Sequence, residues 1–372
     1  MHIGIDCRLP TYQMGGISQY TIHLIAALGE LETGDEYTIF HNRRETRDFR
    51  PPGRRSFSRS NLWTPCHHRY ERYTLGVEIA RHHLDVLHSP DFIPPSFGAS
   101  RRVITVHDLN FIHFPEFLTP ESHRYYTNQI EWAVSVADHI IADSEATRLD
   151  LIDLLGASPA AVTTIHLAAN PIYSAAYSAA EIRATTQALG TGEGFVLGVG
   201  TLEPRKNWPM LIRAYADLRR QYDVAVPLVL VGGRGWIYEE IFQTIARLDL
   251  GPHVMHLSGV TDIQLAHLYR AAGVLAFPSY TEGFGLPALE AMHAGCPVVV
   301  SNRGSLPEVV GDTALKLDPT DLEGWVEALA KVLMDRDYAD TLARAGLEQA
   351  KEFTWRKTAM ATSAIYHKVS AK

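Results

Sequence analysis

Short apolar runs and longer amphipathic stretches alternate along the whole chain. The apolar runs are rich in Val and Ile, as buried parallel strands are. In the first half they predict strands at Ile3–Asp6, Tyr37–Phe40, Val86–Ser89, Val103–Val106, Ile140–Ala142 and Val162–Leu167. The stretch Ile17–Leu28 keeps its apolar residues on one stripe, which predicts a helix, and Ser122–Ala137 predicts another.

A change of composition interrupts this rhythm after residue 168. The stretch 168–194 is rich in Ala, Ser and Thr and contains Asn170-Pro171, which indicates a domain boundary. The rhythm then restarts, with predicted strands at Phe195–Val199, Leu228–Val231, Val254–Leu257, Val274–Phe277, Val298–Val300 and Leu315–Leu317. Alternating strands and helices give a parallel sheet covered on both faces. We therefore predict an α/β protein with two Rossmann-like domains, 1–168 and 169–354, followed by a helical segment, 355–372.

Composition narrows the function classes. A chain of 372 residues with 46% hydrophobic residues is long enough for two globular domains. No apolar run is long enough to cross a bilayer, and the N-terminus does not read as a signal peptide. A net charge of -8 argues against a nucleic-acid partner. Three scattered cysteines favour a reducing cytoplasm over a disulfide framework or a zinc site.

One segment departs from this acidic balance. Arg43–Arg59 contains seven arginines against only Glu45 and Asp48. We expect this segment on the surface of the N-terminal domain, facing an anionic membrane or a lipid-pyrophosphate acceptor. A solvated flexible loop is the alternative.

Residues that follow predicted strands are the first candidates for chemistry, since ligands bind at the carboxyl ends of such sheets. Gly15 and Gly16 open the first helix, where backbone amides favour an anion, although a plain turn is equally consistent. His107 directly follows the strand Val103–Val106 and is a candidate contact or a structural histidine. Ser144 follows Ile140–Ala142 and fits a helix N-cap better than a catalytic hydroxyl.

The second half offers two charged groups. Arg205 and Lys206 follow the strand Phe195–Val199 and suit a diphosphate clamp, although a solvated basic pair has the same spacing. Glu282 lies in a glycine loop, and Glu290 lies in the first turn of the helix that we expect to begin near Pro287. Both carboxylates suit hydroxyl-rich ligands. The alternatives are a surface loop acid for Glu282 and a favourable helix-dipole contact for Glu290.

The motifs GTLEPRKNWPMLIRAY, LVGGRGW and TEGFGLPALEAMHAGCPVVVS, with their E-x7-E pair, resemble the retaining glycosyltransferases of family 4. VHDLNFIHFPE in the first half is consistent with the same family. The resemblance implies a GT-B fold, in which two Rossmann-like domains face each other across a cleft. It also implies an N-terminal domain that binds the acceptor and a C-terminal domain that binds a nucleoside diphosphate sugar. The last helix, around Trp355–Val369, resembles the family segment that crosses back onto the N-terminal domain.

The resemblance also implies roles for individual residues. Arg205 and Lys206 match the diphosphate-binding pair, and Glu290 matches the acid that binds the ribose. Glu282, with the backbone of Gly283, Phe284 and Gly285, matches the site of the donor sugar, so Glu282 is expected to act in catalysis. His107 matches a catalytic histidine placed near that sugar from the other domain. Gly15 and Gly16 match an acceptor or phosphate loop.

The expected function is retaining transfer of a hexose from a nucleoside diphosphate sugar to a glycan or lipid-linked acceptor in polysaccharide assembly. GDP-mannose is the first candidate donor, and UDP and TDP sugars stay open. The alternatives are a non-catalytic nucleotide-sugar-binding subunit and a GT-B epimerase or phosphorylase. No cofactor or metal is expected. Asp335-Arg336-Asp337 has the D-x-D spacing of a metal site, but it falls between helices near the C-terminus and is discounted. The expected location is the cytoplasm, with a peripheral place at the inner membrane face as an extension.

Overall fold

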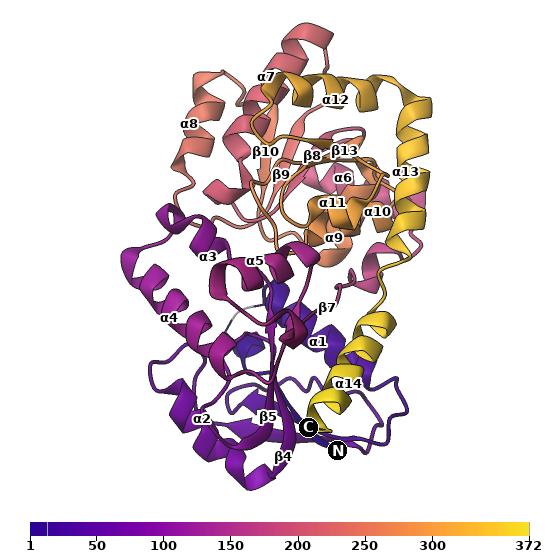
Figure 1. Ribbon diagram of the computed structural model, residues 1–372. Coiled ribbons are helices and arrows are strands. Elements are labelled where there is room, and N and C mark those ends of the chain that lie inside the picture. Colours follow the sequence, from indigo (N-terminus) through magenta and orange to yellow (C-terminus); the bar gives the residue numbers. More distant parts are fainter. Residues whose placement is uncertain (13, 372) are drawn as a thin grey trace. The chain divides into compact units, whose positions relative to one another are not determined.

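The computed structural model describes residues 1–12 and 14–371, which form two compact units (Figure 1). Unit 1 comprises residues 1–167 together with 354–372, and unit 2 comprises residues 168–353. These divisions lie one residue from the predicted domain boundaries. Residues 354–372 group with unit 1, the N-terminal unit onto which the last helix was expected to cross.

Unit 1 is built on a parallel sheet with the strand order β3-β2-β1-β4-β5-β6-β7. Ile3 in the central strand pairs with Tyr37 on one side and with Val86 on the other. The strands are β1 (His2–Asp6), β2 (Glu36–Asn42), β3 (Phe57–Leu62), β4 (Leu84–Ser89), β5 (Ala99–Val106), β6 (His139–Ala142) and β7 (Val162–Thr164). The order reverses between β1 and β4, which is where ligands bind in open α/β sheets.

Helices pack on this sheet. They are α1 (Gly16–Leu28), α2 (Glu71–Ile79), α3 (Asn110–His113), α4 (Pro120–Val136), α5 (Glu145–Leu155) and α14 (Trp355–Ser370). As expected, Ser144 caps α5: its Oγ accepts from the backbone N–H of Thr147 at 3.1 Å. The C-terminal helix α14 is held in unit 1 because the buried Tyr366 hydroxyl lies 2.7 Å from His88 Nδ1 in β4.

Unit 2 repeats the arrangement with the strand order β10-β9-β8-β11-β12-β13. Its strands are β8 (Val196–Val199), β9 (Leu228–Val231), β10 (Val254–Leu257), β11 (Val274–Phe277), β12 (Val298–Ser301) and β13 (Leu315–Leu317). Its helices are α6 (Ala179–Leu189), α7 (Trp208–Tyr222), α8 (Glu239–Arg247), α9 (Asp262–Ala271), α10 (Leu286–His293), α11 (Leu306–Val310), α12 (Leu322–Met334) and α13 (Arg336–Ala350). The buried Trp208 and Trp325 belong to its core. The predicted pair of Rossmann-like α/β domains is confirmed.

The sequence analysis missed β3, which lies partly within the arginine-rich segment. Its sequence, FSRSNL, is polar because β3 is an edge strand that pairs only with β2. Ser58 is exposed and Arg59 is half-buried, so the apolar run that marks a buried strand is absent. The alternative of a solvated flexible loop over Arg43–Arg59 is therefore wrong for residues 57–59, which belong to β3. Within the described part of the chain, no helix combines the length and apolar character needed to cross a membrane.

Candidate active site

Three charged residues of unit 2 meet where its strand order reverses. Arg205 and Lys206 lie in a 3-10 turn, Pro204–Lys206, beyond β8, and Glu282 lies beyond β11. The strands β8 and β11 are neighbours, and the N–H of Tyr280 donates to the carbonyl oxygen of Arg205 at 2.9 Å. The sheet therefore brings together two loops that are 76 residues apart in sequence.

The two cations both pair with Glu282. Lys206 Nζ lies 2.6 Å from Glu282 Oε1, and an Arg205 guanidinium nitrogen lies 2.7 Å from Oε2. The other Arg205 terminal nitrogen lies 2.7 Å from Glu203 Oε1. Lys206 is 6% exposed and Glu282 is 8% exposed. The alternatives of a solvated basic pair and of a surface loop acid are therefore wrong for these two residues.

Burial and charge act in opposite directions on this cluster. Burial alone raises the pKa of Glu282, but Arg205 and Lys206 outweigh it and lower that pKa to about 2. Burial lowers the pKa of Lys206, as does the neighbouring Arg205, while Glu282 opposes both. The carboxylate of Glu282 is thus ionised at neutral pH and holds two cations in fixed positions.

The glycine loop that follows Glu282 has a fixed backbone. Gly285 is the N-cap of α10 with φ +93, a left-handed conformation that favours glycine. Phe284 is buried and packs edge-on against Phe353, with ring centroids 5.7 Å apart. Ser305 Oγ donates to the carbonyl oxygen of Glu282 at 2.9 Å. Pro287 has no N–H and the N–H of Ala288 donates to the carbonyl oxygen of Gly285, so the first turn of α10 offers an anion the N–H of Leu286 and the positive end of the helix dipole.

Glu290 lies in the second turn of α10, whose first turn contains no acidic residue. Its expected place in the first turn, and with it the helix-dipole alternative, is therefore wrong. The Tyr269 hydroxyl donates to Glu290 Oε2 at 2.9 Å. Burial raises the pKa of Glu290 to about 7; Asp262 adds to this and Tyr269 opposes it. Glu290 is thus an acid whose charge changes near neutral pH.

In unit 1, His107 follows β5 and forms a pair with Asp143, which follows β6. His107 Nδ1 lies 2.5 Å from Asp143 Oδ2, and Nε2 lies 2.8 Å from the carbonyl oxygen of Pro90. A carbonyl only accepts, so Nε2 carries a proton. Burial lowers the pKa of His107, but Asp143 and Pro90 outweigh it and raise that pKa to about 9. Both ring nitrogens are engaged, so His107 acts as a fixed cation rather than as a free base.

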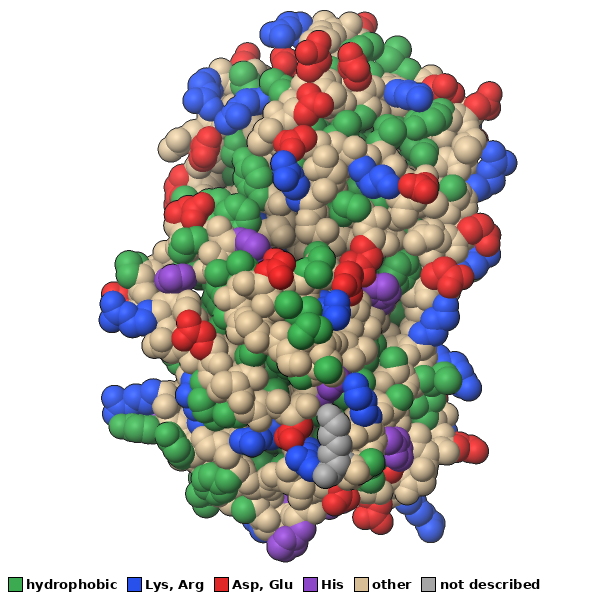
Figure 2. All heavy atoms as spheres, in the orientation of Figure 1, with side chains coloured by type: hydrophobic (Ala, Val, Ile, Leu, Met, Phe, Trp, Pro, Cys, Tyr) green, Lys and Arg blue, Asp and Glu red, His purple; other side chains and the backbone are tan. Residues whose placement is uncertain are grey.

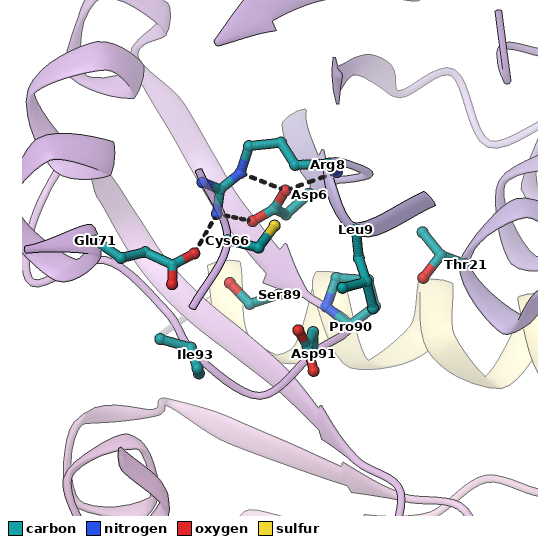
Figure 3. Close-up of a pocket in the computed structure, with 10 residues that line it drawn as sticks. All are labelled: Asp6, Arg8, Leu9, Thr21, Cys66, Glu71, Ser89, Pro90, Asp91 and Ile93. Carbon is teal, nitrogen blue, oxygen red and sulfur yellow. Dashed lines mark hydrogen bonds and ion pairs between the residues drawn. The ribbon is translucent and has the colours of Figure 1, made fainter. Parts of the chain in front are cut away.

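A small polar pocket in unit 1 lies beside this pair (Figure 3). The buried Arg8 lies between Asp6 and Glu71, and its Nη2 is 2.6 Å from the Asp6 carboxylate and 2.7 Å from the Glu71 carboxylate. Ser89 Oγ is buried and finds no hydrogen-bond partner among the described residues. The lining is completed by Leu9, Thr21, Cys66, Pro90, Asp91 and Ile93. The sequence analysis did not single out Asp6, Arg8 or Ser89, although their place at the ends of β1 and β4 was a usable signal.

Gly15 and Gly16 form the N-cap and the first residue of α1. Gly15 has φ −99, which any residue adopts, and a Cβ added to Gly16 would meet no atom within 4 Å. The local backbone therefore does not require glycine at these positions. The structure leaves their expected role as an acceptor or phosphate loop as a prediction.

The arginine-rich segment is partly neutralised by its own contacts. Arg47 pairs with Glu45 at 2.6 Å, and Arg50 pairs with Asp48 at 2.7 Å. Arg59 donates to the carbonyl oxygens of Arg47 and Glu45. The exposed arginines of the segment are Arg43, Arg44, Arg47, Arg54 and Arg55.

Within residues 1–12 and 14–371, no group of three His, Cys, Asp or Glu side chains is arranged to hold a metal ion. The D-x-D spacing at residues 335–337 has a local structural explanation. Asp335 is the N-cap of α13, and its carboxylate accepts from the N–H of Tyr338 at 3.0 Å.

Comparison with known proteins places both units in one family. Residues 14–171 match the model for glycosyltransferase family 4, and residues 182–349 match the model for glycosyl transferases group 1. The O-antigen chain mannosyltransferase B of Escherichia coli is 30% identical over 368 residues, covering 95% of this chain and 96% of that protein. The chain belongs to glycosyltransferase family 4. It is therefore a glycosyltransferase.

Other members and solved structures agree with this assignment. A D-inositol 3-phosphate glycosyltransferase of a Nocardioides species is 31% identical over 333 residues, covering 82% of this chain and 72% of that protein. The structure of Anabaena HepE in complex with UDP and glucose has a TM-score of 0.76 at 20% identity, covering 99% of this chain and 100% of HepE. WaaG, a glycosyltransferase involved in lipopolysaccharide biosynthesis, has a TM-score of 0.76 at 17% identity, covering 98% of this chain and 99% of WaaG. The fold of this glycosyltransferase is GT-B.

Proposed function

We propose that this glycosyltransferase moves a hexose, with retention of configuration, from a nucleoside diphosphate sugar to a glycan or lipid-linked acceptor in polysaccharide assembly. The observation that carries the proposal is the buried cluster of Arg205, Lys206 and Glu282 at the strand ends of unit 2. Mannose is the first candidate sugar, because the Escherichia coli relative that covers nearly the whole chain is named a mannosyltransferase. GDP-mannose is the corresponding first donor.

The cluster supplies what departure of a diphosphate requires. The bond between the sugar C1 and the diphosphate oxygen breaks, a bond from C1 to an acceptor oxygen forms, and the proton of the acceptor hydroxyl passes to the departing diphosphate. Negative charge grows on the leaving diphosphate, where Arg205, Lys206 and the N-terminus of α10 stabilise it. These groups stabilise the charge on the diphosphate better than water does, because the ion pairs with Glu282 hold Arg205 and Lys206 in position before the donor binds.

Glu282 contributes a carboxylate whose charge is fixed by its two partners. In the proposed complex it accepts hydrogen bonds from the hydroxyls of the transferred sugar. As the bond from C1 to the diphosphate oxygen breaks, C1 develops positive charge. A nearby carboxylate stabilises this charge more in the transition state than in the ground state. Direct departure and attack on the same face of the sugar, which is the form of retention that the family resemblance implies, is the form that we propose.

A panel of nucleotide sugars tests the donor. Each is added to the full chain, and the unfolding temperature is followed, because a ligand that binds only the native state stabilises it. We expect GDP-mannose to give the largest shift and to be consumed when a polysaccharide precursor is added. A larger shift with a UDP or TDP sugar would replace mannose and GDP in the proposal. Binding without any release of nucleoside diphosphate would instead indicate a non-catalytic subunit.

Donor affinity should depend on pH through Glu290. A carboxylate that accepts hydrogen bonds from the ribose hydroxyls must be ionised, and its pKa in the free protein is raised to about 7. Donor affinity should therefore be greatest above pH 8 and fall by up to about tenfold per unit below pH 7. Calorimetric titrations between pH 6 and pH 8.5 measure this fall. Glu290→Gln should bind about ten- to a hundredfold more weakly and with little pH dependence. An equally steep profile in the variant would contradict the ribose contact.

The proposed reaction uses no metal, since protein cations and amides stabilise the leaving group. Transfer should accordingly proceed at an unchanged rate in the presence of a chelator such as EDTA. A large loss of transfer that added Mg²⁺ or Mn²⁺ restores would show that a metal ion takes over part of the role given to Arg205 and Lys206.

A further inference from the structure

The outward face of α2 in unit 1 carries large apolar side chains. Tyr73 is 61% exposed and Val77 is 68% exposed, and their spacing of four residues puts them on the same face of the helix. Tyr70, the N-cap residue, precedes Tyr73 by three positions and is also exposed. Single exposed apolar residues are ordinary, but a contiguous row of them marks an interaction site.

Two further aromatic residues widen this row. The backbone N–H of Trp63 donates to Glu78 Oε2 at 2.6 Å, so Trp63, which is 69% exposed, lies along one flank of the helix. On the other flank, a Cβ added to Gly76 would come within 3.1 Å of the ring of the exposed Phe97. Residues 76 and 78 point about 100° to either side of Val77. We call the set Trp63, Tyr70, Tyr73, Val77 and Phe97 the α2 surface.

Cations lie directly on the aromatic rings of the α2 surface. The guanidinium carbon of Arg43 is 3.8 Å from the ring centroid of Trp63, and that of Arg69 is 4.4 Å from the ring centroid of Tyr70. Both arginines are exposed, and neither has a carboxylate partner among the ion pairs of the described residues. Figure 2 shows green hydrophobic and blue basic side chains together where Figure 1 places α2.

We propose that the α2 surface docks unit 1 on an anionic lipid bilayer. Trp and Tyr rings combine an apolar body with a polar edge and favour the boundary between headgroups and acyl chains. Arginines at the same level meet the lipid phosphates, which gives the surface charge complementarity to an anionic leaflet. The proposal is independent of the donor assignment in unit 2.

The same helix connects the surface with the polar pocket of unit 1. Glu71, the first residue of α2, is buried, pairs with Arg8 and lines that pocket. The α2 surface therefore lies on the outer side of an element whose inner side forms a pocket wall. A lipid-linked acceptor held at the bilayer would meet unit 1 beside this pocket.

This docking surface differs from the one that the sequence analysis expected. Arg54 and Arg55 precede β3, whereas Trp63 follows it, and a strand of this length spans about 20 Å. The membrane contact that we propose therefore includes only Arg43 from the segment Arg43–Arg59. It also includes Arg69, which lies outside that segment.

Flotation of the full chain with vesicles tests the proposal. The vesicles are phosphatidylcholine alone, or phosphatidylcholine mixed with phosphatidylglycerol. We expect binding to the mixed vesicles only, and its loss at high salt. The double variant Tyr73→Ser/Val77→Ser should bind about tenfold more weakly. Arg43→Gln/Arg69→Gln should lose about fivefold for each arginine removed.

Two matched controls make the result specific. Leu149→Ser/Leu154→Ser removes exposed apolar side chains from α5, and Arg54→Gln/Arg55→Gln removes exposed charge before β3. Both should bind the mixed vesicles within about twofold of the original chain, since all these positions are exposed and the fold is retained. The proposal is overturned if the original chain does not float, or if either control loses as much binding as its α2 counterpart.

Discussion

Glu282→Gln is expected to lower turnover about ten- to a hundredfold, the largest catalytic effect of any single substitution proposed for this chain. The variant keeps the shape of the side chain but removes the charge that is proposed to face the sugar as C1 becomes positive. It also leaves Lys206, which is buried and bonded to Glu282 at 2.6 Å, without its carboxylate partner. We therefore expect a loss of unfolding free energy of about 3 kcal/mol as well. Saturation kinetics with the identified donor measures the first effect, and chemical denaturation measures the second.

Glu203→Gln is the matched control for this prediction. Glu203 is equally buried and pairs with the same Arg205, but it is given no contact with the sugar. Its replacement should cost stability while turnover stays within a few-fold of the original. If both variants lose turnover equally, the effect passes through Arg205 and the sugar contact of Glu282 is wrong.

Asp143→Asn is expected to change the charge of His107 at neutral pH. In the original chain the pKa of His107 is raised to about 9, above the ordinary value of about 6.5. The charge on His107 therefore stabilises unit 1 fully near pH 6.5, and this contribution disappears as the pH rises to about 9. Because burial raises the pKa of Asp143, the ion pair is also lost when the pH falls far enough to protonate that carboxylate. Without the Asp143 carboxylate, His107 should titrate near or below pH 6.5. The unfolding free energy of unit 1 should fall by about 3 kcal/mol near pH 6.5 and by less at higher pH.

Nitrogen-15 NMR of the imidazole rings separates this effect from general loss of packing. We expect both ring nitrogens of His107 to stay protonated up to about pH 8 in the original chain, and to titrate lower in the variant. The His113–Asp150 pair, with a 2.7 Å contact but a half-exposed position, provides the control. Asp150→Asn should cost less than about 1 kcal/mol. A His107 ring that titrates near pH 6.5 in the original chain would contradict the account of the pair.

Buried strands were predictable because their sequences are almost wholly apolar. Leu228–Val231 and Val274–Phe277 have the predicted bounds, since parallel strands covered on both faces leave no polar position to blur the run. The edge strand β3 was not predictable, because its outward residues are polar and it pairs on one side only. Edge strands of this kind carry too few buried positions to produce a pattern.

The membership of the site was harder to predict than its location. The residues that follow strands were the right places to look, but the contact between Lys206 and Glu282 depends on β8 lying beside β11. Strand order is a property of the folded sheet, and no local spacing encodes it. Likewise Ser144 was singled out after β6, whereas its neighbour Asp143 is the residue that bonds to His107. That bond too exists only because β5 and β6 are adjacent.

Calorimetric titration of a nucleoside diphosphate into the full chain tests the central claim most directly, because it needs neither the sugar nor the acceptor. GDP and UDP are titrated separately into the original chain and into Arg205→Met and Lys206→Met. Lys316→Met, which removes a more exposed cation of unit 2, is the control. We predict that at least one of the two nucleotides binds the original chain and the control equally well, and that each cluster variant binds about ten- to a hundredfold more weakly. Equal binding by all four proteins would contradict a diphosphate site at Arg205 and Lys206.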